Sequence, residues 1–191
     1  MAIIESQTWD IQVEVTGSKF ETKATKRKEN LIEMPIEATT KPASIVKIRA
    51  QELYDARITR DYEKIVELTW AGSVQECGGR KMFIELMKEM MEKFDQKGQK
   101  LHSYRVGEPD IFVVDGGYTF AVLPTISEMR TPDSRIVTDS FALAISPDSG
   151  QSWSFVEGRL FKDKSERNAF VPKIPATLLF PEYKNPKVYK N

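Results

Sequence analysis

Residues 146–153 read Ser-Pro-Asp-Ser-Gly-Gln-Ser-Trp and form the most specific pattern in the chain. This spacing of Ser, Asp, Gly and Trp is typical of a tight β-hairpin turn. The carboxylate of Asp148 can accept hydrogen bonds from backbone N–H groups one or two residues further on. Gly150 can adopt the positive φ that a tight connection requires, and Trp153 would open the return strand and cover the turn. The predicted structural turn comprises Ser146, Asp148, Gly150 and Trp153.

The pattern Ser-x-Asp-x-Gly-x-x-Trp is known as the Asp-box. Propellers of the sialidase type carry several such boxes, one in each blade. This chain has a single box in 191 residues, which is too short for a propeller with helices in front of it, so we reject that fold. The box indicates a hairpin in a β-rich region and names no reaction.

Apolar and polar residues alternate on both sides of the box, as they do in half-buried strands. Asp115-Gly116-Gly117 and Thr131–Ser134 are predicted to form turns between such strands. Together these segments predict a β-meander. Its strands are expected over residues 101–106, 111–114, 118–128, 136–146 and 153–160.

Upstream of the meander, apolar residues recur with a helical period. We expect a first amphipathic helix over residues 43–59, followed by a second, short helix with Asp61 as its N-cap. Residues 73–76 are predicted to form a short strand. A third helix follows and is expected to end at Gly98, because glycine often terminates helices.

The third helix carries an apolar stripe at positions i, i+3, i+4, i+7 and i+11. Its members are Phe83, Leu86, Met87, Met90 and Phe94. Methionine side chains are flexible and fill irregular gaps, but they also form adaptable binding surfaces. Core filling is the favoured interpretation of the methionines on this helix, and a binding surface is the alternative. These methionines are Met82, Met87, Met90 and Met91.

Three regions are predicted. Residues 1–41 form an N-terminal β arm and a charged linker, with a strand from Trp9 to Val15 and a boundary at Thr39–Pro42. Residues 42–161 form the main domain. Residues 162–191 form a proline-rich tail that is expected to pack on the domain through three apolar residues. These are Leu178, Leu179 and Phe180.

Composition excludes several classes of function. Lys plus Arg and Asp plus Glu number 28 each, so there is no electrostatic case for a nucleic-acid partner. With one cysteine, Cys77, and one histidine, His102, we expect no Cys/His zinc site, and the sequence predicts no other metal and no cofactor. We expect no membrane span, because no run approaches roughly 18 apolar residues. The single cysteine favours the cytoplasm, and a periplasmic or secreted location remains open if a signal peptide was removed.

The order of elements resembles the nuclear-transport-factor-2-like superfamily, the cystatin-like cone. The residues that carry the likeness are Leu53–Arg57 and Arg60–Ile65, which resemble the amphipathic helix, Asp-Tyr pair and second helix that open those domains. Gly79–Phe83 resembles the Gly-Arg start of their third helix. The likeness covers roughly residues 42–161 and rests on shape motifs, so it does not by itself assign a function.

The resemblance implies an α+β fold in which a curved antiparallel sheet wraps around a long helix. It also implies an apolar pocket at the open end of the cone and frequent homodimerisation through the outer sheet face. Ketosteroid isomerase, scytalone dehydratase and polyketide cyclases belong to that superfamily. Dehydratase chemistry with a pair of histidines is disfavoured, because this chain has a single histidine.

Asp139 is the first candidate catalytic residue. It shares one strand face with bulky apolar residues, among them Phe141, where a core residue would be expected. If that face lines the cone, desolvation would raise the pKa of Asp139 and make it a general base. An Asp at the rim, bonded to a neighbouring side chain, is the favoured alternative. Glu157 could form a paired-acid site with Asp139, and a solvated strand end is the favoured interpretation of Glu157.

His102 and Tyr104 are predicted to share a strand face with Val106. His102 could act as an acid or base near neutral pH, although an exposed histidine is the favoured interpretation. Tyr104 is expected to assist Asp139. Four aromatic residues are candidate walls of a ligand pocket, and they are Tyr54, Trp70, Phe120 and Phe141.

Three functions are compatible with this sequence. The first is a pocket domain that binds a small apolar ligand or a protein partner. The second is a cofactor-free isomerase, cyclase or lyase that uses Asp139. The third is an interaction module whose cone is filled by its own side chains. A ligand-sized cavity with an acid inside would favour either of the first two.

Overall fold

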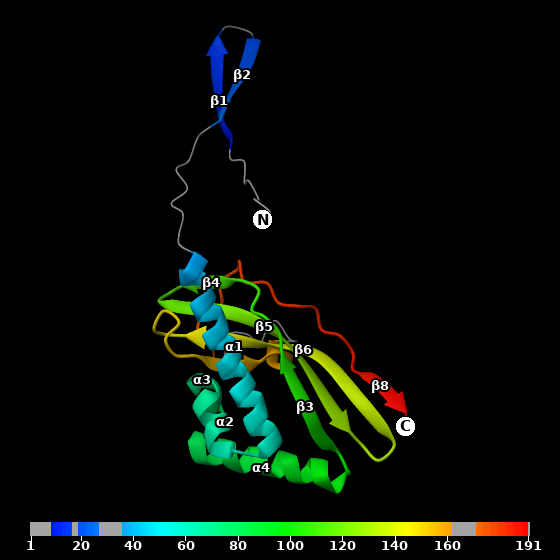
Figure 1. Cartoon of the computed structure of the whole chain (residues 1–191). Coiled ribbons are helices and arrows are strands. Elements are labelled where there is room, and N and C mark those ends of the chain that lie inside the picture. Colours follow the sequence, from blue (N-terminus) through cyan, green and yellow to red (C-terminus); the bar gives the residue numbers. More distant parts are fainter. Residues whose placement is uncertain (1–8, 17–18, 27–35, 162–170, 191) are drawn as a thin grey trace. The chain divides into compact units, whose positions relative to one another are not determined.

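The computed structural model describes residues 9–16, 19–26, 36–161 and 171–190, and contacts divide the chain into units Met1–Pro35 and Ile36–Asn191 (Figure 1). In the first unit, β1 (Trp9–Thr16) and β2 (Lys19–Lys26) form an antiparallel hairpin. The strand predicted from Trp9 to Val15 is therefore present, and β2 pairs with it. The charged linker after Lys26 and the tail residues 162–170 lie outside the described residues.

The second unit is α+β and is built on an antiparallel sheet. Within the described residues, the sheet has six strands and curls strongly into a half-barrel (Figure 1). The long strands β5 and β6 pair along their whole lengths, β3 and β4 share the outer edge of β5, and β7 and β8 share the outer edge of β6. The strands are β3 (Lys100–Val106), β4 (Phe112–Asp115), β5 (Tyr118–Arg130), β6 (Ser134–Ser146), β7 (Ser154–Glu157) and β8 (Lys187–Lys190).

The Asp-box forms the β6–β7 turn, as predicted. Asp148 Oδ1 accepts hydrogen bonds from the backbone N–H groups of Gln151 at 3.1 Å and Ser152 at 2.8 Å, so its partners lie three and four residues on, not one or two. Gly150 adopts a φ of 89°. The indole N–H of Trp153 donates to the carbonyl oxygen of Gly150 at 3.0 Å, which closes the turn under a buried ring.

Asp148 also receives two hydroxyl hydrogen bonds within the turn. Ser146 Oγ lies 2.8 Å from Oδ1, and Ser152 Oγ lies 2.6 Å from Oδ2. These donors stabilise the ionised carboxylate, with the hydroxyl of Ser152 as the largest contributor, and lower the pKa of Asp148 to about 2. Both carboxylate oxygens of Asp148 accept hydrogen bonds from groups within the turn. We therefore assign the Asp-box a structural role.

Four α-helices precede the sheet among the described residues of the second unit. They are α1 (Ile36–Thr59), α2 (Tyr62–Leu68), α3 (Ala71–Glu76) and α4 (Arg80–Gln96). The helix α1 begins before the predicted boundary, so Thr39–Pro42 lies inside it. The predicted strand over 73–76 is wrong, because these residues belong to α3. Gly98 follows α4 with a φ of 64°, in agreement with a glycine stop.

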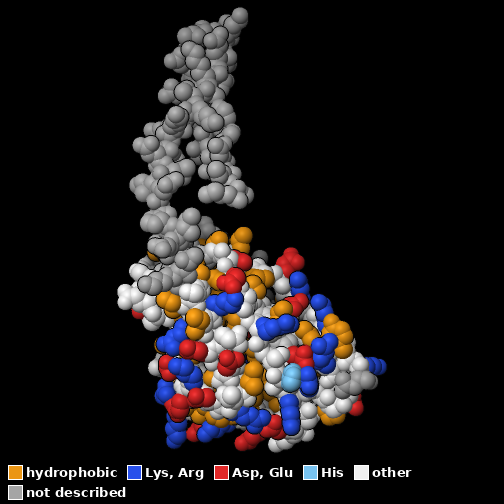
Figure 2. Space-filling model, in the orientation of Figure 1, with side chains coloured by type: hydrophobic (Ala, Val, Ile, Leu, Met, Phe, Trp, Pro, Cys, Tyr) orange, Lys and Arg blue, Asp and Glu red, His pale blue; other side chains and the backbone are white. Residues whose placement is uncertain are grey.

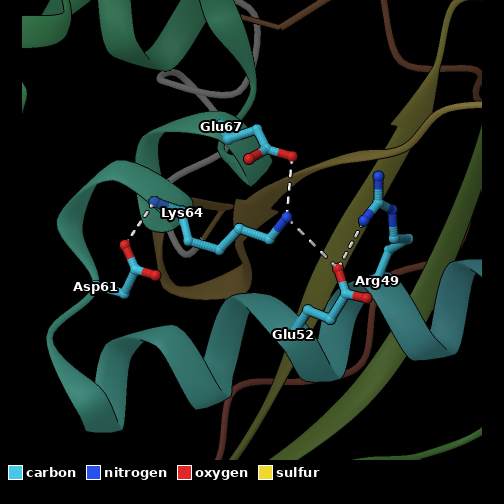
Figure 3. A network of polar contacts seen from close by, with 5 residues as sticks. All are labelled: Arg49, Glu52, Asp61, Lys64 and Glu67. Carbon is cyan, nitrogen blue, oxygen red and sulfur yellow. Dashed lines mark hydrogen bonds and ion pairs between the residues drawn. The ribbon is translucent and has the colours of Figure 1, made fainter.

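Polar side chains connect α2 to α1 (Figure 3). The carboxylate of Asp61 accepts a hydrogen bond from the backbone N–H of Lys64 at 3.1 Å, which confirms the predicted N-cap. The ammonium group of Lys64 lies 3.0 Å from Glu67 and 3.9 Å from Glu52, and Glu52 pairs with Arg49 at 2.7 Å. Partly exposed pairs of this kind contribute little stability individually, so they mainly fix the α1–α2 register.

The sheet is apolar on both faces, and each face has its own cluster. The first cluster lies between the sheet and helices α1 and α2, and it includes Leu53, Tyr54, Ile65, Leu68, Leu123, Ala142, Ala144, Trp153 and Phe155. The second cluster lies between the other face and the C-terminal segment, and it includes Phe120, Val122, Phe141, Leu143, Ile145, Val156, Phe161, Val171 and Leu178. The helix that packs on the sheet is α1, and β6 meets it with alanines.

The C-terminal segment covers the outer face of the sheet. The short 3₁₀ helix η1 (Gly158–Phe161) begins this cover, and Phe180 stacks on Phe161 and Phe141 with ring centroids 5.0 and 5.2 Å away. Leu178 is buried, but Leu179 is 77% exposed, so two of the three predicted packing residues contribute. Because β8 also pairs with β6, the segment is part of the sheet's structure.

Candidate functional site

A cavity of about 490 Å³ lies between α4 and the concave side of the sheet. The helix α4 contacts α2 and α3, and the cavity separates its apolar side from β3, β5 and β7. The volume falls within the range of roughly 300–1,000 Å³ that is usual for small-molecule pockets. The cavity is lined by Arg57, Thr69, Ser73, Glu76, Cys77, Phe83, Leu86, Met87, Met90, Met91, Phe94, Leu101, Tyr104, Ser127, Met129, Phe155, Val156, Glu157, Arg159 and Leu160.

One wall is the apolar stripe of α4. All five of its predicted members line the cavity, and so does Met91. Most of them are only half-buried, and Leu86 is 45% exposed. Core filling holds only in part: Met91 is buried and Phe83 packs against the first cluster, whereas Met87 and Met90 are half-buried against the cavity. Flexible methionines at this position give the wall an adaptable shape.

The polar base of the cavity is an ion pair between Arg57 of α1 and Glu157 of β7. Arg57 Nη1 donates to Glu157 Oε1, and the two side chains are 14% and 16% exposed. Burial is the largest single effect and lowers the pKa of Arg57, but the charge and hydrogen bond of Glu157 together with the two neighbouring tyrosines outweigh it, so the pKa is raised overall. Arg57 Nε is buried and has no hydrogen-bond partner among the described residues.

Two tyrosines stand beside this pair. The rings of Tyr54 and Tyr104 stack with centroids 4.4 Å apart, and the guanidinium carbon of Arg57 lies 5.2 Å from the centroid of Tyr54. Burial raises the pKa of both phenols, and the negative charge of Glu157 adds to the increase. Both hydroxyls are therefore neutral near neutral pH, and Tyr104 lines the cavity as a neutral hydrogen-bonding group.

The helix α3 contributes two small polar side chains. Ser73 is 9% exposed, and its Oγ has no hydrogen-bond partner in the described part of the chain. Cys77 is a half-buried free thiol one turn further on. At the exposed rim stand one acid and one base, Glu76 and Arg159. The cavity thus combines apolar walls with a few polar groups, as ligand pockets commonly do.

Of the three residues first proposed as catalytic, Tyr104 alone lines the cavity, and Glu157 of the alternative acid pair lines it as well. His102 does not lie on the same strand face as Tyr104. Leu101 pairs with Met129 and Ser103 pairs with Glu128, so the pairing register skips His102. His102 is the extra residue of a β-bulge, which turns it outward. It is exposed, in agreement with the favoured interpretation of this residue.

Asp139 lies outside the cavity lining. It belongs to the outer face of β6, as its alternation with Phe141 indicated, but that face is covered by the C-terminal segment. Its side chain is 36% exposed and lies 3.7 Å from Lys187, so it is a surface ion pair. Glu157 pairs in register with Ala142 on the helix-facing side. The proposed pairing of Asp139 with Glu157 is therefore wrong.

The predicted aromatic walls divide between the two faces. Tyr54 is fully buried behind Tyr104 and does not line the cavity itself. Phe120 and Phe141 belong to the outer cluster, and Trp70 packs against it in an edge contact with Tyr118 at 6.0 Å. These three residues stabilise the fold away from the cavity, because both faces of the sheet are covered.

Sequence reasoning missed Arg57 altogether. The residue follows Leu53 by one helical turn and falls on the buried face of α1, where a charged side chain is unusual. That position was a usable signal.

Within the described ranges, no group of His, Cys, Asp and Glu side chains is arranged to hold a metal ion, and no helix is long and apolar enough to cross a membrane. Comparisons with protein-family models, curated proteins and solved structures found no match to this chain.

Proposed function

We propose that this protein binds a small, largely apolar molecule in the cavity between α4 and the sheet. The observation that carries the proposal is the cavity itself, about 490 Å³ with a continuous apolar wall on α4 and polar groups at its base. Leaving such a wall half-exposed forgoes the hydrophobic stabilisation of a packed core. A bound apolar molecule would recover that stabilisation.

An interaction module with a filled cone has less support, because the apolar side of α4 is not filled by the protein's own side chains. A cofactor-free isomerase, cyclase or lyase is a second candidate, since a carboxylate, Glu157, lines the cavity beside Tyr104. Its Oε1 is engaged by Arg57, which makes Glu157 less available as a base. Binding is therefore the better supported function.

We also propose that the half-barrel corresponds to the cone of the nuclear-transport-factor-2-like superfamily. The support is the order of elements, in which helices precede a hairpinned, strongly curled sheet (Figure 1). The apolar cavity beneath α4 adds to it. In this chain the helix on the sheet is α1, and α4 closes the cavity. Homodimerisation through the outer face stays a prediction.

The neutral fluorophore N-phenyl-1-naphthylamine tests the proposed function. We expect its fluorescence to rise on titration into the full-length protein, with saturation at one site. Met90→Trp places a large ring in the cavity and should abolish the rise. Glu85→Trp adds the same ring on an exposed position of α4 outside the lining and should leave binding unchanged. Equal binding by all three proteins would contradict the proposal.

A further inference from the structure

We infer that the ligand of this cavity is an uncharged molecule with one hydrogen-bonding head, such as a hydroxyl or carbonyl group, on an apolar body. The inference rests on the proposed function and names the chemical class of its ligand. Three observations carry it: the neutralised ion pair at the base, the unpartnered polar atoms of two lining residues, and the balanced charges at the rim.

The first observation concerns net charge. Arg57 and Glu157 neutralise each other inside the cavity, where both side chains are about 15% exposed. A carboxylate or ammonium head placed beside this pair would have no counter-charge left to it. An uncompensated charge in a poorly solvated site is strongly unfavourable, whereas a neutral head adds no such penalty.

The second observation concerns unused hydrogen-bonding capacity. The buried Arg57 Nε and Ser73 Oγ both belong to cavity-lining residues, and neither has a partner among the residues that the structure describes. A buried donor without an acceptor is unfavourable. A ligand hydroxyl or carbonyl oxygen that displaces the atoms covering Arg57 Nε would supply an acceptor, and a plain hydrocarbon would not.

The third observation concerns the rim and the outer surface. The charged residues that line the cavity are two arginines, at 57 and 159, and two glutamates, at 76 and 157, so the lining has no net charge. On the face shown in Figure 2, Lys and Arg side chains are interspersed with Asp and Glu side chains. That face therefore carries no field of one sign that would steer an ion.

The apolar wall contributes little further discrimination. Met87, Met90 and Met91 are flexible side chains, and methionine surfaces accommodate bodies of different shape. Selection is accordingly expected to come from the head group, and the body can be linear or cyclic.

A series of matched ten-carbon probes tests the inference on the full-length protein. N-phenyl-1-naphthylamine is displaced at neutral pH by 1-decanol, decanoate or decylamine, each below the concentration at which it self-associates. We expect 1-decanol to displace the fluorophore at a concentration about tenfold or more below that of either ion. Equal or stronger displacement by decanoate or decylamine would overturn the inference. Failure of the fluorophore itself to bind would overturn the proposed function, and the inference with it.

A charge variant provides a second test. Glu157→Gln removes the negative member of the pair, so the preference should move toward decanoate by about tenfold relative to 1-decanol. Glu85→Gln removes an exposed charge outside the lining and should keep the wild-type preference. Thermal denaturation establishes that the variants are folded. An unaltered preference in folded Glu157→Gln would overturn the inference, and the wild-type probe series decides the matter if that variant does not fold.

Discussion

Arg57 and Glu157 lie 100 residues apart in the chain, yet their side chains form an ion pair at the base of the cavity. The pair joins the last turn of α1 to the end of β7. It supplies the buried charged groups of the cavity and leaves them neutral as a pair. This contact therefore contributes both to holding α1 against β7 and to the proposed selection of an uncharged ligand.

Breaking this pair is expected to destabilise the protein. Glu157→Gln leaves the Arg57 guanidinium without its carboxylate, and loss of one partner of a buried pair costs about 3–5 kcal/mol. Urea unfolding followed by tryptophan fluorescence measures the change. In a double-mutant cycle, Arg57→Met combined with Glu157→Leu should cost less than the sum of the two single changes. Strict additivity would contradict a direct interaction.

The Asp-box predicts a pH dependence of stability. The pKa of Asp148 is lowered from 3.8 to about 2 by hydroxyl and backbone donors, so its folded pKa lies below its unfolded pKa. Its contribution is fully present above pH 3.8 and is lost as the pH falls toward 2. Asp148→Ala should lower the melting temperature by a few degrees at pH 6, and the difference from wild type should shrink below pH 3.8. An exposed turn variant, Asp115→Ala, should show no such convergence.

Gly158 is predicted to be intolerant of a side chain. A Cβ at this position would lie 2.7 Å from Phe141 Cδ1 and closer still to the carbonyl oxygen of Phe141. Gly158→Ala should therefore destabilise the protein by about 1–3 kcal/mol through overpacking. Gly107→Ala is the matched control, because its added Cβ would meet Pro124 at 3.4 Å. Similar urea midpoints for the two variants would show that η1 is not fixed against β6 in this way.

Cys77 offers a chemical reporter of occupancy. Its thiol is half-buried and lines the cavity, and it is the one cysteine in the sequence. We expect saturating 1-decanol to slow alkylation of Cys77 by iodoacetamide several-fold, because the ligand restricts access. Mass spectrometry of the intact protein follows the reaction. Unchanged labelling in the presence of a bound probe would place the probe elsewhere.

Much of the fold could be predicted from the sequence, because local chemistry determines it. The Asp-box turn, the Asp61 cap and the stop at Gly98 depend on residues within one turn of each other, and all three are present. The α4 stripe was recognised as well. Its use as a cavity wall was expected only as the alternative to core filling, since periodicity identifies an apolar face without showing what covers it.

The position of the cavity could not be predicted for a related reason. Both faces of β6 are apolar, with Ala142 and Ala144 on one side and Phe141 and Leu143 on the other. The bulky side was expected to line the pocket, but helix α1 packs on the alanines, which allow close approach. A single β-bulge moved His102 off the face of Tyr104. Contacts between distant segments, such as Arg57 with Glu157, leave no mark in a local pattern.

The most direct test of the account is a crystal structure of the protein grown with 10-bromo-1-decanol, read from the anomalous signal of bromine. The account predicts bromine between α4 and the sheet, near Met87 and Met90, with the hydroxyl toward Arg57. Bromine confined to the outer surface, or a cavity closed by movement of α4 onto the sheet, would contradict it.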